Sequence, residues 1–435
     1  MSSTSVASVA LASPPHSLSL WERAVARVTG WLTSPSVLRF GCAVLRAVAP
    51  VAVLGKRAVV VAHDDVLEVL TRDRDFTIAE INGPRTERSN GPFVLSLDRG
   101  EQHNREKALL NAVVRREDLE PIAALVTSAG EACVERAAAQ GRIDLVQDLT
   151  RLVALRVVQR YFGVPGPSDA VLQGWLRALF HELFLNLGDD QRVIDGGVRA
   201  FGEMRPYLLG LIERRRAELA PDAPEPEDVL GRMIFLQRVE PYREFLDDDA
   251  VCRNISGLII GALETTSKAA ILVVEELLRR PEALAKARER AVAGDREGLR
   301  EHVLEALRFN PFAPLLVRYC KKDTVIGAAR GAARTVPGGT TVYAMICSAM
   351  FDTDAIARPK AYRPGRRMDY LHFGYGLHRC QGHLINHVQV PELVGMILRL
   401  EGLRPAPGAE GAIAYDGPFP DRFVVHFDAV MKRAT

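Results

Sequence analysis

The hydrophobic and polar positions along the chain predict a protein built mostly of helices. From residue 101 to about 238, apolar residues recur at helical spacing in successive stretches, which Gly- and Pro-containing breaks separate. Further helices are predicted near 281–293, 297–309 and 381–400. Short β-branched runs predict a few strands, at 58–62, 315–319, 324–326, 340–344 and 422–427. The expected fold class is therefore mainly α with a small β region (α+β).

One predicted helix, roughly Asp247 to Leu278, is apolar over much of its surface and carries Gly261-Ala262-Leu263-Glu264-Thr265-Thr266 near its middle. A helix without a polar face has to run through the interior. A mid-helix Thr can bond to the carbonyl one turn back and bend the helix there. We therefore expect a bend at Thr265, with Glu264 beside it able to relay protons. The alternative is a Thr265 packed in the core and a Glu264 held in a salt bridge.

Two stretches nearer the N-terminus are less regular. Val37 to Leu54 is the most membrane-like part of the chain, but Arg39, Arg46 and Pro50 interrupt it before it reaches the length of a bilayer span. We predict an amphipathic helix there, with a peripheral membrane contact as the alternative. Residues 76–97 contain two Gly and two Pro with little periodicity, and we predict a long loop.

Composition narrows the class of protein without identifying it. The 435 residues are 48% hydrophobic and 25% charged, and the formal net charge is +2, which is typical of a globular protein and too weakly basic for nucleic acid as the main partner. The six cysteines form no CxxC pair, which predicts neither a disulfide framework nor a zinc site and fits a reducing cytoplasm. We expect residues 1–20 to be a flexible tail, residues 21–435 to be one domain, and no segment to span a membrane.

The most informative segment is Phe373-Gly374-Tyr375-Gly376-Leu377-His378-Arg379-Cys380-Gln381-Gly382, directly before the last long helix. Unpaired N–H groups and the helix dipole at a helix N-terminus favour a thiolate over a thiol. The two glycines before the cysteine let the backbone turn tightly and approach a flat ring, and Phe373 can shield the sulfur from water. The segment therefore predicts a cradle for a metal-binding thiolate.

This segment resembles the cysteine-ligand loop of the cytochromes P450, F-G-x-G-x-H-x-C-x-G. The resemblance implies that haem b (iron protoporphyrin IX) is the cofactor and that Cys380 is the ligand of its iron. Phe373, Gly374 and Gly382 would shape the haem contact, and His378 would donate to a haem propionate. An axial thiolate favours O–O bond cleavage, which is the chemical reason for Cys in place of His.

Other segments resemble the same family. Glu305-Ala306-Leu307-Arg308 is similar to its E-x-x-R element, which with Arg366 would form a buried network that holds the haem loop. Gly261 to Thr265 resembles the oxygen-activation segment A-G-x-E-T, with Gly and Ala exchanged, so that Ala262 would lie at the haem while Glu264 and Thr265 would be catalytic. His103 and Lys107, one helical turn apart, and Arg318 match propionate-binding positions.

The resemblance implies a monooxygenase that inserts one oxygen atom from O2 into a small apolar molecule. The pocket wall would include 76–97, 180–187, Ala262 and 312–316. No flavin, nicotinamide or iron–sulfur motif is present, so electrons would come from a separate ferredoxin or flavodoxin with its reductase. Basic residues near the cysteine loop are candidates for contacting it: Arg358, Lys360, Arg363, Arg366, Arg367 and Arg379.

Two alternatives remain open from the sequence. One is a peroxide-driven or isomerising haem-thiolate enzyme, which needs no reductase; the Glu264-Thr265 pair argues against it. The other is a haem-thiolate sensor or carrier without catalytic activity. Consumption of reductant only in the presence of substrate would separate an enzyme from a sensor.

Overall fold

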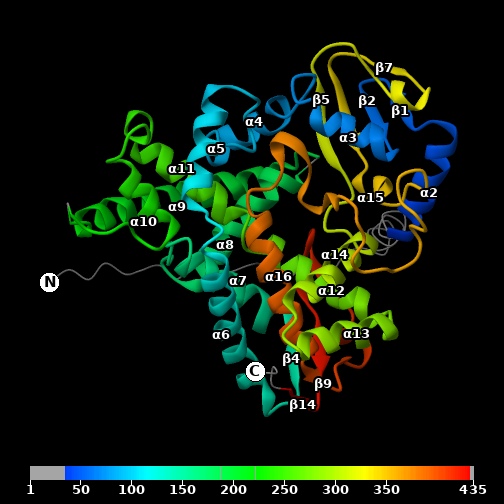
Figure 1. The fold of residues 1–435 in the computed structure, drawn as a ribbon. Coiled ribbons are helices and arrows are strands. Elements are labelled where there is room, and N and C mark those ends of the chain that lie inside the picture. Colours follow the sequence, from blue (N-terminus) through cyan, green and yellow to red (C-terminus); the bar gives the residue numbers. More distant parts are fainter. Residues whose placement is uncertain (1–34, 187, 221, 432–435) are drawn as a thin grey trace.

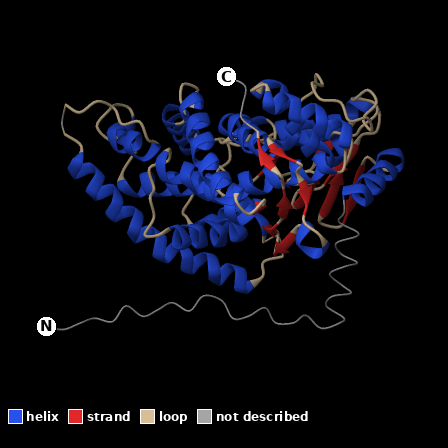
Figure 2. Ribbon diagram, turned by 90° about the horizontal axis from the view of Figure 1, so that it is seen from below, coloured by secondary structure: helices blue, strands red, loops and turns tan. Residues whose placement is uncertain are grey.

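The computed structural model describes residues 35–186, 188–220 and 222–431, so the predicted tail at residues 1–20 lies outside the described residues. Helices make up most of the described chain, and the strands gather on one side of it (Figure 2). The larger, helical part shares one continuous apolar core. Its α-helices are α5 Glu101–Val113, α6 Leu119–Ala138, α7 Arg151–Arg160, α8 Asp169–Phe180, α9 Gln191–Glu218, α10 Val229–Leu236, α11 Asp248–Ile260, α12 Glu264–Leu278, α13 Pro281–Val292, α14 Arg296–Phe309 and α16 His383–Leu398.

The smaller part is built on a five-stranded sheet with the order β1-β2-β8-β5-β3 and has an apolar core of its own. In Figure 1 this sheet lies beside the short helices α2, α3 and α15. The strands β2 and β8 pair in parallel, while β8 and β5 pair antiparallel, which places β8 in the middle of the sheet and β5 between β8 and the edge strand β3. The elements of this part are α2 Pro35–Val48, β1 Val51–Leu54, β2 Arg57–Val60, α3 His63–Thr71, β3 Phe76–Thr77, α4 Ala79–Ser89, β5 Leu316–Cys320, β6 Thr324–Ile326, β7 Arg334–Val336, β8 Thr340–Ala344 and α15 Ile346–Ala349.

The remaining strands form small antiparallel sheets against the helical part. The sheet β10-β13-β4 joins the C-terminal region to the turn after α6, and β11 and β12 form a hairpin. These strands are β4 Arg142–Asp144, β9 Leu400–Glu401, β10 Arg404–Pro405, β11 Ala414–Asp416, β12 Phe419–Arg422, β13 Val424–His426 and β14 Ala429–Val430. The predicted strand at 422–427 therefore exists, but it begins two residues later, as β13.

The predicted interior helix is present but interrupted. It consists of α11 and α12, which are separated by a break at 261–263. The whole stretch Asp248–Leu278 is long and apolar enough to cross a membrane by composition, yet 67% of its most apolar window is buried inside the protein. It is therefore placed as a core helix, as its pattern predicted.

Two predictions for the N-terminal region were wrong in their extent. The helix predicted over 37–54 ends at Val48, because Pro50 has no N–H to continue it, and 51–54 pairs with 57–60 as a hairpin. The loop predicted over 76–97 contains the helix α4, which continues past Pro84. Ion pairs hold α4 to distant residues, with 2.7 Å between Arg88 and Glu182, and such tertiary contacts are not visible in a local pattern.

Candidate functional site

The loop before α16 has the tight geometry that its glycines predict. The Cys380 N–H donates to the Phe373 carbonyl at 2.8 Å, which closes the loop. Gly374 and Gly376 both have φ of +71°, a conformation that disfavours any residue with a side chain. A Cβ at Gly376 would also lie 2.6 Å from the Leu70 carbonyl oxygen. The loop is therefore packed so closely against α3 that only glycine fits there.

The surroundings of the Cys380 thiol leave one side of it clear. A Cβ on Gly382 would lie 3.8 Å from the sulfur and 3.3 Å from the amide nitrogen of Asn386, so the glycine keeps the space beside the sulfur free. Burial raises the pKa of the Cys380 thiol, and the Gly382 N–H, Lys107 and Arg379 act in the opposite direction. A bound metal cation would favour the thiolate in such a buried place.

A cavity of about 70 Å³ lies beside the thiol, between the α11–α12 stretch and α16. The predicted residues Ala262, Cys380 and Gly382 all line it, and Thr266 joins its two sides by donating to the Asn386 side-chain oxygen at 3.0 Å. The rest of its wall is mostly apolar: Phe93, Val94, Leu95, Leu110, Val114, Phe162, Gly257, Leu258, Gly261, Gln381, Ile385 and Gln389. The cavity therefore joins the predicted iron ligand to part of the predicted pocket wall.

The four predicted propionate partners come together from α5, β5 and the cysteine loop. The rings of His103 and His378 lie edge to face, 5.8 Å apart between centroids. Burial, and then the charges of Arg318, His103 and Lys107, lower the pKa of His378 to about 3. Arg318 is only 4% exposed, and it donates to the Val317 carbonyl. Burial lowers its pKa to about 10.

Several ring nitrogens of this basic cluster have no hydrogen-bond partner among the described residues. The Nδ1 of His103 and both ring nitrogens of His378 are buried without a hydrogen-bond partner among the described residues. Lys107 donates to the Gln381 side-chain oxygen at 2.7 Å, and no described carboxylate forms an ion pair with Lys107 or Arg318. Buried donors without acceptors are costly, and the oxygens of two propionates would satisfy them. The residues present therefore fit the propionates of a haem.

The break between α11 and α12 coincides with the bond predicted for Thr265. Its hydroxyl donates to the Gly261 carbonyl at 2.5 Å, one turn back, where the regular helical bonds are missing. The exchange of Gly261 and Ala262 relative to the family pattern therefore does not prevent the bend. The bend lies directly beside the cavity, whose wall includes Gly261, Ala262 and Thr266.

Glu264 forms the salt bridge that the sequence left as an alternative. Its side chain is 2% exposed and lies 3.1 Å from Arg151 and 3.5 Å from Arg177. Asp421, which is 46% exposed, in turn lies 3.7 Å from Arg151. These two arginines could not be predicted from the sequence, because each is more than 80 residues from Glu264 and neither belongs to a motif.

The predicted network around Glu305 is present, and Glu305 and Arg308 are fully buried in it. Arg308 binds both carboxylate oxygens of Glu305, at 2.7 and 2.9 Å, and Arg366 reaches one of them at 3.1 Å. The Glu305 carboxylate also accepts two hydrogen bonds that the sequence did not suggest. The donors are the Tyr370 hydroxyl, at 3.0 Å, and the Arg363 N–H, at 2.8 Å. The network connects α14 to the segment that leads into the cysteine loop.

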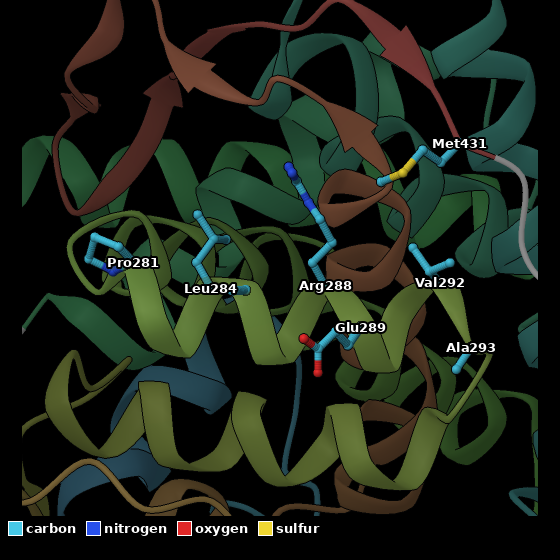
Figure 3. A pocket seen from close by; sticks show the side chains of 8 residues that line it. Pro281, Leu284, Arg288, Glu289, Val292, Ala293 and Met431 are labelled. Carbon is cyan, nitrogen blue, oxygen red and sulfur yellow. The ribbon is translucent and has the colours of Figure 1, made fainter.

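A larger hollow, of about 660 Å³, lies elsewhere, between α13 and Met431 (Figure 3). It is open and mostly apolar, and its one arginine, Arg288, donates to the Leu398 and Leu400 carbonyls. It contains neither a cysteine nor a histidine, so it offers no thiolate or imidazole ligand for a haem iron. The cavity beside Cys380 is therefore the candidate haem site.

Comparisons with known proteins agree with this site. The family model described as Cytochrome P450 matches residues 48–409. The C-19 steroid 1alpha-hydroxylase of Sorangium cellulosum is 25% identical over 349 residues, covering 76% of this chain and 81% of that protein. The pulcherriminic acid synthase of Bacillus subtilis is 21% identical over 348 residues, covering 77% of this chain and 80% of that protein. A curated relative from Mycobacterium tuberculosis, 26% identical over 264 residues, is matched over about half its length, 53%, and over 56% of this chain.

The solved structure of CalO2 superposes with a TM-score of 0.78 at 22% identity, covering 91% of this chain and 96% of that one. The family match covers most of the chain and includes the cysteine loop, the E-x-x-R element and the interrupted interior helix. The chain therefore belongs to the cytochrome P450 family of haem-thiolate enzymes.

Proposed function

We propose that this P450 is a monooxygenase that inserts one oxygen atom from O2 into an organic molecule. The observation that supports this most directly is the position of the Cys380 thiol. It lies beside a cavity that the interrupted α11–α12 helix borders. Haem b would be held by Cys380 at the iron and by His103, Lys107, Arg318 and His378 at the propionates. When bound, it supplies the oxygen-activating chemistry.

The role of Thr265 and Glu264 would be to control protons. The Thr265 hydroxyl bonds to Gly261 where the helix opens, so it can pass a proton into the bend. Glu264 has the connection to the surface, since Arg151 and Arg177 link it to the exposed Asp421. A carboxylate held this way can take up a proton from the surface and release it near Thr265.

The substrate pocket would accept a molecule with an apolar body. Phe93, Val94 and Leu95 come from the predicted wall segment 76–97 and line the cavity together with Ala262 and Leu258. The other predicted wall segments, 180–187 and 312–316, do not border this cavity, and residue 187 lies outside the described residues.

Electrons would come from a separate ferredoxin or flavodoxin. The side chains of Arg358, Lys360, Arg363, Arg367 and Arg379 are exposed near the cysteine loop, and we call these five residues the basic patch. Arg366 does not belong to it, because its side chain is 7% exposed and bonds to Glu305. An acidic surface on the donor would complement the patch. The cysteines are all free, consistent with a cytoplasmic protein.

The test is reconstitution of the haem-loaded protein with a ferredoxin, its reductase, NADPH and ¹⁸O2 over a panel of apolar compounds. We expect a product that carries one ¹⁸O atom, with NADPH consumption that depends on substrate. Turnover with hydrogen peroxide alone would favour a peroxide-driven enzyme. Tight binding without any turnover under either condition would favour a sensor or carrier.

A further inference from the structure

The helix α2 lies at the outer edge of the smaller part (Figure 1), and its charged side chains face inward. A surface helix of a globular protein normally exposes its charged residues and buries its apolar ones. In α2 both arginines face the protein: Arg39 donates to the Phe309 carbonyl at 2.6 Å, and Arg46 donates to the Ser348 carbonyl at 3.0 Å. The two charges therefore hold the helix to the protein and leave an outward side without them.

Phe40, Val44 and Val48 lie on this outward side, and we call these three residues the apolar face of α2. Each follows the one before by four residues, so all three lie on one side of the helix. Phe40 and Val48 are 74% and 73% exposed, and Leu54, at the end of β1, is 72% exposed. These four residues are among only nine large apolar side chains that are exposed in the described chain. Scattered exposed apolar residues are ordinary, but a cluster of them indicates an interaction surface.

The end of the β1–β2 hairpin lies on the same side of the sheet as α2. Val59 of β2 packs in the same small apolar cluster as Cys42 and Leu45 of α2. Arg57 shares the sheet face of Val59, because alternate residues of a strand point to the same side. Leu54 shares this face as well, since it is the cross-strand partner of Arg57. Leu54 and Arg57 therefore lie on the side of the sheet that α2 covers.

The charge of this region has one sign. Residues 35–62 contain four basic residues and neither Asp nor Glu. The first 62 residues hold six basic residues and one acid, although the net charge of the whole chain is only +2. Lys56 and Arg57 are exposed at the hairpin turn, and neither takes part in an ion pair within the described residues. Exposed apolar side chains together with exposed cations suit the surface of an anionic membrane.

We propose that the apolar face of α2 and the β1–β2 turn bind the surface of an anionic lipid bilayer without crossing it. Phe40, Val44 and Val48 enter the boundary between headgroups and acyl chains, and Lys56 and Arg57 contact the lipid phosphates. A second copy of this chain suits the surface less, because a symmetric contact would bring the same cations of both copies together without an acid between them. The inference does not depend on the proposed reaction.

The test is sedimentation of the full-length, haem-loaded protein with lipid vesicles. One set of vesicles is phosphatidylcholine alone, and the other is phosphatidylcholine mixed with phosphatidylglycerol. The protein should bind the anionic vesicles at least about tenfold more tightly than the neutral ones, since its exposed cations meet anionic headgroups there. At about 1 M salt this difference should fall below about twofold, because salt screens the charges and leaves the apolar contribution.

Two double variants separate the apolar contribution from the charged one. Phe40→Ser with Val48→Ser should weaken binding to anionic vesicles about tenfold or more, because the binding strength follows the apolar area that enters the bilayer. Lys56→Glu with Arg57→Glu should remove the preference for anionic vesicles, because the two cations no longer meet the headgroups.

The matched control is Val171→Ser with Val198→Ser, two exposed valines on α8 and α9, and it should change binding by less than about twofold. Circular dichroism verifies that each variant is folded. The inference is overturned if the wild type binds neither kind of vesicle or binds both equally. It is also overturned if the Phe40 and Val48 double variant binds as well as the wild type, or no worse than the control.

Analytical ultracentrifugation without vesicles tests the other occupant of this face. The wild type should sediment as a monomer. A dimer that the Phe40 and Val48 double variant dissolves would overturn the inference, since a second copy would then cover the face. Because the readout is binding to vesicles, a protein that binds them as expected but never turns over would contradict monooxygenation and still support the membrane surface.

Discussion

Cys380 differs from the other five cysteines in its backbone as well as in its position. Cys42, Cys133, Cys252, Cys320 and Cys347 are fully buried in the described structure, whereas Cys380 is half-buried and lines a cavity. It also follows two glycines with positive φ. These features make Cys380 the thiol that a flat cofactor can approach, while the others act as small apolar side chains.

The assignment of Cys380 as the iron ligand can be tested by its removal. Cys380→Ala should abolish the far-shifted absorbance band of the reduced protein with carbon monoxide, because that band requires a thiolate ligand. Cys320→Ala is the control, since the Cys320 sulfur bonds to the backbone carbonyls of Lys322 and Val336, and the variant should keep the band. A mutant at 380 that retains the band would contradict the assignment.

Thr265 offers a second test at the scale of one residue. Thr265→Ala removes the hydroxyl that bonds to Gly261 but favours helix, so haem and substrate should still bind. Reductant should still be consumed, while product per NADPH falls several-fold and hydrogen peroxide rises. The control is Thr266→Ala, whose hydroxyl bonds to Asn386 instead and which should stay coupled. Unchanged coupling at 265 together with uncoupling at 266 would transfer the role to Thr266.

At the scale of elements, α14 contains the same E-x-x-R spacing twice, with different consequences. Glu305 and Arg308 are both 0% exposed and bind each other, and Arg308 also donates to the carbonyls of Met350 and Pro359. Glu297 and Arg300 repeat the spacing eight residues earlier on the same helix, but the Glu297 side chain is 70% exposed. Sequence spacing alone cannot separate the two pairs; the depth of burial does.

This repetition provides a matched pair of variants. Glu305→Ala should destabilise the protein by roughly 3 to 5 kcal/mol and yield little haem-loaded protein, because it leaves the buried charge of Arg308 unpaired. Glu297→Ala should change the free energy of unfolding by less than about 1 kcal/mol, as exposed pairs do. Haem content after purification and urea unfolding measure both. Similar losses in the two variants would show that burial is not what distinguishes them.

The helix α14 also carries a titrating group. Burial lowers the pKa of His302 to about 4, below the ordinary 6.5. The unfolded chain therefore binds a proton that the folded protein excludes, so this stability is present above about pH 6.5 and is lost as the pH falls toward 4. Between pH 7 and pH 5 the loss from His302 is about 2 kcal/mol. Urea unfolding of wild type and His302→Phe should show a shallower pH dependence in the variant; parallel curves would contradict it.

At the scale of the whole molecule, the sequence predicted what short segments encode. The cysteine loop, the Thr265 bend and the main helices after residue 100 follow from local patterns, the Glu305–Arg308–Arg366 network follows from the family resemblance, and all were found in place. The features that the sequence did not predict depend on contacts between residues far apart in the chain. The helix α4 is held by ion pairs to the α8–α9 region, and the partners of Glu264 come from α7 and α8.

The same limit applies to the surface that meets an electron donor. The sequence placed Arg366 with its basic neighbours, yet the fold turns its side chain onto Glu305 and the Ala357, Arg358 and Ala361 carbonyls. The family resemblance had also assigned Arg366 to the Glu305 network, and the tertiary structure decides between the two assignments. The basic patch of Arg358, Lys360, Arg363, Arg367 and Arg379 is what remains available to a partner.

Charge reversal in the basic patch should therefore weaken the donor interaction without disturbing the haem site. Arg363→Glu with Arg367→Glu should raise the KM for an acidic ferredoxin roughly tenfold at low ionic strength, because opposed charges no longer steer the encounter. The difference should shrink toward 1 M salt, where the screening length falls to about 3 Å. The control, Arg192→Glu with Arg199→Glu on α9, changes the net charge equally and should leave KM nearly unchanged. Equal effects of the two double variants would mean that net charge, and not this patch, attracts the donor.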